Sequence, residues 1–335
     1  MGFFSKRRAV GLDIGAGIVR ALTLEGSADK PVITGVAAAA VVSDDGNAAT
    51  AQAIHAALAQ ARADGESVVA SVGGPDVIVR QVALPALPPE RVRQVLELQH
   101  REFGLLPPGE GVLEAQILSR SKTGCSVLAV SIPKPLIEAR TRLLEQAAVK
   151  LRTLDVEALA LMNGALHVAK VEAGELLVML NLWDERAILC LRSDRGPLIV
   201  RHLDVGAAAL IDRVRKAGVP VATATGTRLA TQEIDGAKAF DACHDIVQRV
   251  AEEIRRSLSF YRSEYDRDAR PRYMLGGWLR LRQWNRWLTD ELGLESPFEV
   301  LDPFQAAQLA APRTDVDESA GSEFLQAFGL ALRAL

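Results

Sequence analysis

Three apolar segments near the start of the chain are separated by short turns. Residues 10–14 (VGLDI) form an apolar run with one acidic residue, and residues 18–22 (IVRAL) form a second run after Gly15-Ala16-Gly17. A third apolar stretch covers residues 32–42. Apolar runs joined by a glycine turn are typical of antiparallel strands. We therefore predict that the chain opens with a meander of three strands.

The next segments complete a first lobe. An alanine-rich helix is predicted for residues 49–63, because Asp64-Gly65 then ends the helical pattern. Residues 67–72 are almost uniformly apolar, as in a buried strand, and residues 77–84 alternate apolar and polar positions, as in an exposed strand. The order up to residue 84 is three strands, a helix and two strands.

A proline cluster marks a boundary after these strands. Pro85, Pro88 and Pro89 precede an amphipathic helix over residues 90–103, and Pro89 suits the first turn of that helix. We expect residues 86–152 to form a small α/β subdomain inserted into a first lobe of residues 1–85 and 153–174. The further elements predicted here are strands 112–118, 126–132 and 151–156 and helices 135–148 and 157–169.

The second half repeats the opening pattern. Three strands are predicted over residues 176–182, 185–192 and 198–204, which mirrors the meander at the start. The fold class is therefore α/β, a duplicated architecture of two lobes with a cleft between them, the second lobe spanning residues 175–335. Its other predicted elements are helices 207–217, 225–233, 237–265, 281–292, 303–310 and 323–335 and strands 273–275 and 298–300.

Composition narrows the class of protein. The 335 residues carry a net charge of -3, with 49% hydrophobic and 24% charged residues, values of an ordinary globular protein that give no reason to expect a nucleic-acid partner. Cys125, Cys190 and Cys243 lie far apart without a CxxC pair, which favours reduced thiols in the cytosol and no metal site. We find no apolar run of the ~18 residues that cross a bilayer and no secretory signal.

The first glycine turn has two interpretations. Gly15 and Gly17 can take positive φ and bring backbone N–H groups close to a phosphate, and Asp13 is placed to hold a metal ion or a water. The alternative is a plain hairpin turn in which Asp13 bonds its own backbone. A single glycine-rich turn does not decide between these interpretations.

Several segments together resemble one family. The opening MGFFSK with residues 10–15 (VGLDIG), residues 71–85 (SVGGPDVIVRQVALP) and residues 253–261 (EIRRSLSFY) are similar to the PilM family of type IV pilus assembly proteins, within the actin-like ATPase superfamily. Residues 126–132, 154–160 and 328–333 extend the resemblance over nearly the whole chain. It implies an actin-like (ribonuclease H-like) fold with the inserted subdomain of the cell-division protein FtsA.

In that superfamily three loops hold ATP, and two of them are altered here. Asn181 stands where the second phosphate loop has Asp, and Trp183 where it has Gly. Trp183 either fills the phosphate space or packs into a core, and the adenosine loop keeps two of its three small residues. The candidate cofactor-binding residues are Asp13, Gly15, Ala16, Gly17, Asn181, Gly206, Gly276 and Gly277, with Asp13 as a Mg²⁺ ligand only where nucleotide binds.

The resemblance implies an adaptor rather than an enzyme. In the family, PilM is cytoplasmic, is held at the inner membrane by its partners, and binds the N-terminal cytoplasmic peptide of the membrane protein PilN in a groove between the first lobe and the insertion. Residues 71–84 and 90–132 would face that groove. ATP binding is expected to be weak or lost, and other platform proteins and self-association are further expected contacts. Two alternatives stay open, an active ATPase or kinase with Mg-ATP between the lobes, and the cytoplasmic domain of a type II secretion platform.

Overall fold

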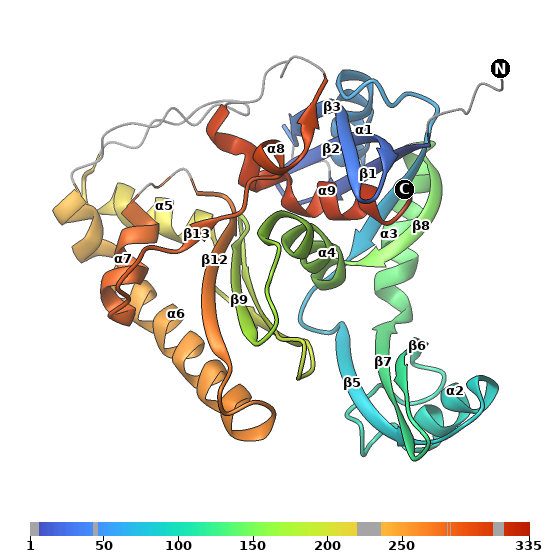
Figure 1. The fold of residues 1–335 in the computed structure, drawn as a ribbon. Helices are drawn as coiled ribbons and strands as arrows, with labels where there is room; N and C mark the ends of the chain where they lie inside the picture. Colours follow the sequence, from blue (N-terminus) through green and yellow to red (C-terminus); the bar gives the residue numbers. More distant parts are fainter. Residues whose placement is uncertain (1–6, 43–45, 220–235, 280, 282, 311–317) are drawn as a thin grey trace.

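Two lobes and a smaller sheet at one end make up the computed structural model (Figure 1). It describes residues 7–42, 46–219, 236–279, 281, 283–310 and 318–335. Each lobe has its own mixed sheet, and the inserted strands form a third sheet, below the first lobe in Figure 1.

The first sheet has the strand order β14-β3-β2-β1-β4-β8. Its antiparallel centre is the predicted meander, β1 (Arg8–Ile14), β2 (Ile18–Ser27) and β3 (Lys30–Ala40), with Asp13 opposite Arg20. The buried strand β4 (Ser67–Val72) runs parallel to both β1 and β8 (Lys150–Val156). The short β14 (Gln308–Leu309) adds a parallel edge to β3.

Helices cover both faces of this sheet. On one face, α1 (Asn47–Gln60) and α3 (Lys134–Gln146) bury their apolar side chains against β1 and β4. On the other face, α4 (Glu157–Ala169) and α9 (Leu325–Leu332) pack against β1, β2 and β4 and against each other. The first lobe is therefore completed by the last helix of the chain.

Close approach of α9 depends on two glycines. A Cβ atom at Gly11 would overlap the carbonyl oxygen of Ala327, and one at Gly329 would overlap the carbonyl oxygen of Ala160. Without side chains at these points, the helix lies directly against strand β1 and helix α4. The chain end is thus packed to backbone contact in the middle of the first lobe.

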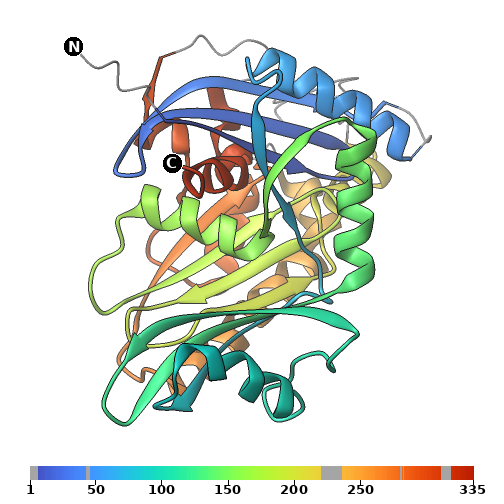
Figure 2. The same cartoon turned by 90° about the vertical axis from the view of Figure 1, so that its right-hand side faces the viewer.

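The inserted sheet has the order β5-β7-β6 and is antiparallel throughout. Its strands are β5 (Ile78–Pro85), β6 (Gly111–Arg120) and β7 (Gly124–Pro133), and α2 (Pro89–Leu98) covers one face through Val92 and Leu96 (Figure 2). Side chains of the opposite face, including Val130, join a core with α4 and the second sheet.

The second sheet has the order β11-β10-β9-β12-β13. It begins with the second meander, β9 (Glu175–Leu182), β10 (Ala187–Arg192) and β11 (Ile199–Leu203), and continues with β12 (Arg270–Gly277) and β13 (Glu299–Val300). Its outer face packs on α5 (Ala207–Lys216), α6 (Gly236–Glu264) and α7 (Gln283–Leu292). Its inner face packs on α4, so α4 lies between the two lobes.

The predicted elements recur with differences near the C-terminus. The α/β class, the two lobes that each open with a three-strand meander, and the inserted sheet are confirmed. The helix predicted for residues 303–310 is shorter, α8 (Pro303–Ala306), and β14 follows it. The helix predicted for residues 323–335 is a 3₁₀ helix, η1 (Glu318–Phe324), followed by α9. The helix predicted for residues 225–233 lies outside the described residues.

The predicted domain boundaries stay a prediction, but two helices pack across them. Helix α3 was assigned to the insertion, and its second half packs with α1 on the first sheet. Helix α9 was assigned to the second lobe, and it packs mainly on α4 and β1. Within the described part of the chain, no helix combines the length and the apolar character needed to cross a bilayer.

Candidate functional site

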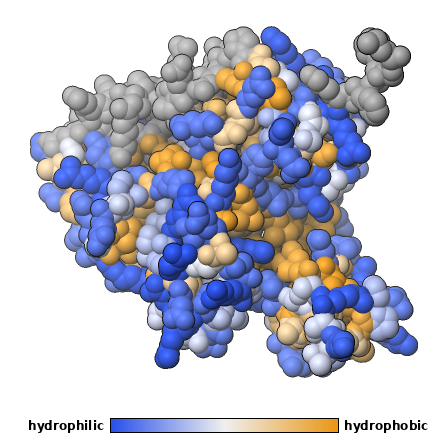
Figure 3. All heavy atoms as spheres, in the orientation of Figure 1, coloured by the Kyte–Doolittle hydropathy of each residue, from blue (hydrophilic) through white to orange (hydrophobic). Residues whose placement is uncertain are grey.

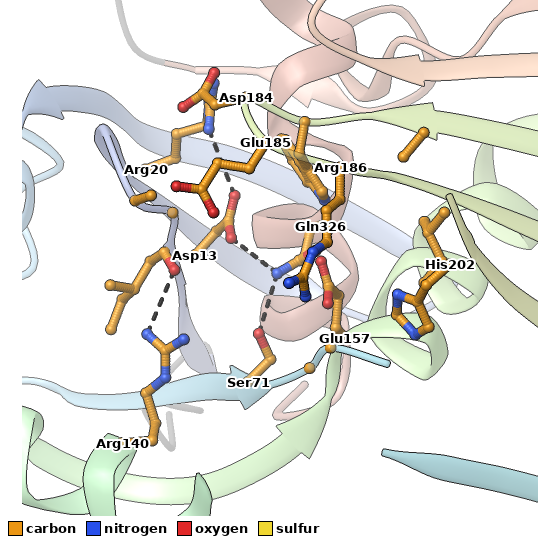
Figure 4. A pocket seen from close by; sticks show the side chains of 18 residues that line it. Asp13, Arg20, Ser71, Arg140, Glu157, Asp184, Glu185, Arg186, His202 and Gln326 are labelled. Carbon is orange, nitrogen blue, oxygen red and sulfur yellow. Dashed lines mark hydrogen bonds and ion pairs between the residues drawn. The ribbon is translucent and has the colours of Figure 1, made fainter. Parts of the chain in front are cut away.

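A polar pocket of about 190 Å³ lies between the lobes (Figure 4). Its first wall is the β1–β2 hairpin, with Asp13, Gly15 and Ala16, and its second wall is the turn between β9 and β10, with residues 183–188. The end of β4, the start of α4 and the side chain of Gln326 on α9 close the remaining sides. We call this space the interlobe pocket.

Asp13 is the most constrained carboxylate in the pocket. It is 4% exposed, and the side-chain amide of Gln326 donates a hydrogen bond to its Oδ1 at 2.8 Å. The same amide donates to the hydroxyl of Ser71 at 3.0 Å. Burial raises the pKa of Asp13 to about 6, although the positive charges of Arg20 and Arg140 oppose that shift.

Arg20 lies beside Asp13 and is 2% exposed. Its Nη1 is 3.7 Å from Oδ2 of Asp13, its Nη2 is 2.8 Å from Oε2 of Glu323, and its guanidinium carbon is 5.1 Å from the centre of the Trp183 ring. Burial alone would lower the pKa of Arg20, but attraction to Glu323, Asp13 and Asp184 raises it. The guanidinium is therefore held as a cation between the two lobes.

The local fold explains this arrangement. Asp13 and Arg20 are opposite each other in the antiparallel β1–β2 pair, where side chains of facing residues lie on the same side of the sheet. The turn is tight, with the N–H of Gly15 donating to the carbonyl of Ile18 at 3.0 Å. A Cβ atom at Gly17 would be 3.4 Å from Oδ2 of Asp184, so the two hairpins meet tip to tip.

A second acid and a second arginine line the lower side of the pocket. Glu157 begins α4, and burial together with the nearby Asp13 raises its pKa to about 7, against the opposing charge of Arg140. Arg140 on α3 donates to the carbonyl of Ile14 at 3.4 Å, and burial lowers its pKa. Two carboxyls with raised pKa values thus line the same pocket as three arginines, Arg20, Arg140 and Arg186.

Only part of the predicted site lines this pocket. Asp13, Gly15 and Ala16 do, while Gly17 faces Asp184 beside it. The other four predicted residues lie elsewhere: Asn181 is fully buried in β9, Gly206 precedes α5 behind the β9–β10 turn, and Gly276 and Gly277 end β12 next to Asn181 and Leu182.

The adenosine-loop glycines are in packed surroundings. A Cβ atom at Gly276 would be 2.6 Å from Oδ1 of Asn181, and the carbonyl of Gly277 accepts a hydrogen bond from Ser322 at 2.9 Å. The following Trp278 is 7% exposed and belongs to the core of the second lobe. The predicted adenosine loop is therefore in contact with Asn181 and Ser322.

These residues do not fit a magnesium–nucleotide complex in this arrangement. Mg²⁺ is bound through carboxylates and its own waters. Here Oδ1 of Asp13 accepts a hydrogen bond from Gln326, and Oδ2 has no hydrogen bond but lies 3.7 Å from the Arg20 guanidinium, whose positive charge opposes a second cation there. The Trp183 side chain lines the pocket at the position where the superfamily has Gly. The pocket volume of about 190 Å³ is also below the ~300–1,000 Å³ of usual small-molecule sites.

Sequence reasoning missed the residues that define the pocket. Arg20 had a signal, since a charged residue within the apolar run IVRAL is rarely buried without a partner. Glu157 and Arg140 are ordinary helix residues in the sequence, and Gln326 is more than 300 residues away from Asp13. The sequence left two places open for Trp183, the phosphate space or a core. In the structure it lines the pocket wall beside Arg20 and also packs against the core shared by α4 and the second sheet.

Comparisons with known proteins agree with the fold. A solved PilM-PilN type IV pilus biogenesis complex is similar, with a TM-score of 0.76, 22% identity, and coverage of 97% of this chain and 98% of that chain. The ethanolamine utilization protein EutJ from Carboxydothermus hydrogenoformans has a TM-score of 0.50 at 12% identity, covering 97% and 89%.

A third structure is more distant. The cytoplasmic domain of EpsL, an inner membrane component of the type II secretion system of Vibrio cholerae, has a TM-score of 0.37 at 15% identity, covering 63% of this chain and 73% of that one. A similarity this low supports no argument. A search of curated proteins found no match.

The sequence itself matches a family described as type IV pilus assembly protein PilM over residues 11–335. This match includes both lobes, the insertion and the last helix. The resemblance that the opening hairpin and the EIRRSLSFY segment indicated is thereby confirmed. The chain belongs to the PilM family of type IV pilus assembly proteins.

Proposed function

We propose that this chain is an adaptor of an inner-membrane pilus assembly platform, which binds the N-terminal cytoplasmic peptide of a PilN-like membrane protein. The observation that carries the proposal is a hollow between the insertion and the lobes, in which hydrophobic residues gather (Figure 3). The similarity to a PilM-PilN complex supports a partner of this kind. The protein would then sit in the cytoplasm and reach the membrane through its partners.

Half-buried apolar side chains supply the binding surface. They pack against the core shared by the insertion, α4 and the second sheet. An extended or helical peptide can bury apolar side chains against such a surface. We call this set the peptide groove and define it by Leu128 and Ile132 on β7, Leu136 on α3 and Leu159 on α4.

The groove residues cover only part of the segments that the sequence predicted to face the peptide. Residues 90–132 were expected to face the peptide, but Val92 and Leu96 of α2 pack against the other face of the inserted sheet, together with Val127. Within that range, the apolar side chains that join the core shared with α4 and the second sheet are on β7, which supports a contribution of this strand to the groove. Contact by residues 71–84 stays a prediction.

We further propose that nucleotide binding is weak or lost and that the adaptor works without ATP turnover. The support is the pairing of Asp13 with Arg20 and the place of Trp183 in the pocket wall. The alternative of an active ATPase or kinase would need Mg-ATP between the lobes. Calorimetry that detects tight Mg-ATP binding together with turnover would overturn this part of the proposal.

Peptide binding tests the adaptor proposal directly. The probe is the synthetic N-terminal cytoplasmic peptide of a PilN-like protein encoded beside this chain, with binding followed by calorimetry or fluorescence anisotropy. We expect Leu128→Asp and Leu136→Asp to weaken binding at least about tenfold, because a charge would then be buried in the interface. Leu98→Asp is the matched control, since Leu98 is 76% exposed on the insertion.

Three outcomes would contradict the proposal. The first is a native protein that does not bind the peptide. The second is a groove variant that binds as well as native protein, and the third is a Leu98→Asp variant that loses binding to the same extent. Circular dichroism of each variant shows whether a loss of binding reflects a loss of fold.

A further inference from the structure

We propose that Arg20 is the resident cation of the interlobe pocket: its guanidinium takes the place of a divalent metal and holds Asp13, Asp184 and Glu323 together, so the hairpins of the two lobes stay in contact without a bound nucleotide. The inference is independent of the peptide groove. It explains how the cleft of this chain is held together although two of its nucleotide loops differ from those of the ATPase superfamily.

The three carboxylates come from three separate parts of the chain. Asp13 ends β1, Asp184 is in the turn between β9 and β10, and Glu323 is in η1 just before α9. Arg20 contacts the first at 3.7 Å and the third at 2.8 Å, and the negative charge of Asp184 acts on it as well. In Figure 4 the Arg20 and Asp184 side chains are drawn at the upper end of the pocket, above Asp13.

The charges explain why a cation is needed here. Asp13 and Glu323 are 4% and 3% exposed, and a buried carboxylate is costly unless a positive charge or hydrogen bonds compensate it. In ATPases of two lobes a bound metal can supply that charge. Here the positive charge belongs to an arginine side chain of the protein itself, and a guanidinium stays protonated at every physiological pH.

Trp183 extends the contact into the second lobe. Its indole lies 5.1 Å from the Arg20 guanidinium carbon, within the range of a cation–π interaction. The backbone N–H of Trp183 donates to the carbonyl of Arg186, and the carbonyl of Trp183 accepts from the N–H of Ala207 at the start of α5, so the backbone that carries the ring is anchored in the second lobe. Arg20 therefore links the two lobes through polar contacts, while α4 links them through apolar packing.

Substitution of Arg20 should leave its carboxylate partners without a counter-charge, so that an added cation can bind them. We expect Arg20→Ala to lower the Tm by roughly 6–10 °C, because buried carboxylates lose their counter-charge. We expect Mg²⁺ or Mn²⁺, and separately guanidinium ion at non-denaturing millimolar concentration, to restore part of that loss. The Tm of native protein should respond to neither cation, and Arg152→Ala, at an exposed arginine on β8, should behave like native protein.

A second variant isolates the contact between the lobes. Trp183→Ala leaves the ion pairs of Arg20 in place but removes the ring that reaches it, so hydrogen exchange should become faster in residues 183–187 and unchanged in α6. This variant also serves where Arg20→Ala does not fold.

Several results would overturn the proposal. One is a native protein whose Tm rises with Mg²⁺ or with Mg-ATP, which shows that the pocket still takes a metal. Another is an Arg20→Ala protein that is as stable as Arg152→Ala, or one that neither divalent cations nor guanidinium stabilise. Unchanged hydrogen exchange in Trp183→Ala would contradict the contact between the lobes.

Discussion

The side-chain amide of Gln326 lies 2.8 Å from Oδ1 of Asp13, although 313 positions separate the two residues in the sequence. The same amide reaches Ser71, so one side chain from the last helix joins the ends of β1 and β4 at the pocket. Because all three residues are less than 10% exposed, these bonds are protected from water.

Gln326→Ala should destabilise the protein by about 1–3 kcal/mol, because Asp13 and Ser71 both lose a buried donor. Urea denaturation followed by circular dichroism measures the change. Gln305→Ala is the matched control, since Gln305 also donates to an aspartate, Asp302, but in an exposed position at 3.2 Å. The control should change stability by less than about 0.5 kcal/mol. Equal effects of both substitutions would contradict the role of Gln326.

The raised pKa of Glu157 predicts a pH dependence of stability. Its pKa rises from 4.5 to about 7 in the folded protein, so the folded state holds this proton more tightly than the unfolded chain. The resulting stabilisation is complete below pH 4.5 and is lost as pH rises through 7. Asp13, raised to about 6, acts in the same direction.

Glu157→Gln should therefore reduce the loss of stability between about pH 5 and about pH 8 relative to native protein. Urea midpoints at the two pH values measure this difference. Glu114→Gln, at an exposed position on β6, should leave the difference as it is in native protein. A Glu157→Gln protein with the native pH dependence would show that this carboxyl does not titrate as described.

Gly329→Ala should destabilise the first lobe by about 1–3 kcal/mol, because the added methyl group would overlap the carbonyl of Ala160 and push α9 away from α4. Thermal unfolding gives the measurement. Gly236→Ala is the control, since the nearest atom among the described residues, in Gln283, would be 3.9 Å from the new Cβ. If Gly329→Ala were neutral, the close packing of α9 on α4 would be wrong.

The three cysteines should be unreactive in the folded protein. Cys125, Cys190 and Cys243 are buried, and burial raises the pKa of Cys190 to about 12 and that of Cys243 to about 11. Since the thiolate is the reactive form, a disulfide reagent should modify none of them quickly in native protein and all three after denaturation. Fast modification before unfolding would show an opening that exposes one of these thiols.

Local patterns predicted the fold well because both lobes open with strands joined by short turns. The meanders of residues 8–40 and 175–203 follow directly from the alternation of apolar runs and turns. The edge strand β14 could not be predicted in this way, because two residues have no periodic pattern and their pairing with β3 is set by tertiary structure.

The candidate site was harder to predict for the same reason. Asp13 and its glycine turn are contiguous in sequence, and they do line the pocket. Asp13 interacts with Arg140 on α3 and Gln326 on α9, and Arg20 beside it pairs with Glu323 in η1. The positions of these three elements depend on how the lobes pack. The role of Asn181, Gly206, Gly276 and Gly277 in binding a nucleotide stays a prediction, and the structure places these residues outside the pocket wall.

The position of α9 has a consequence for synthesis of the protein. Strand β1 leaves the ribosome before the other described elements, and the helix that covers it, α9, follows all of them. Until then one face of the first sheet lacks its cover, including the side chains of Leu22 and Leu24 that later meet Phe328. The second lobe has its whole sheet and its helices α5, α6 and α7 earlier. The first lobe is thus completed only after the second, and the apolar side chains of its sheet that α9 covers stay exposed in the nascent chain until α9 is made.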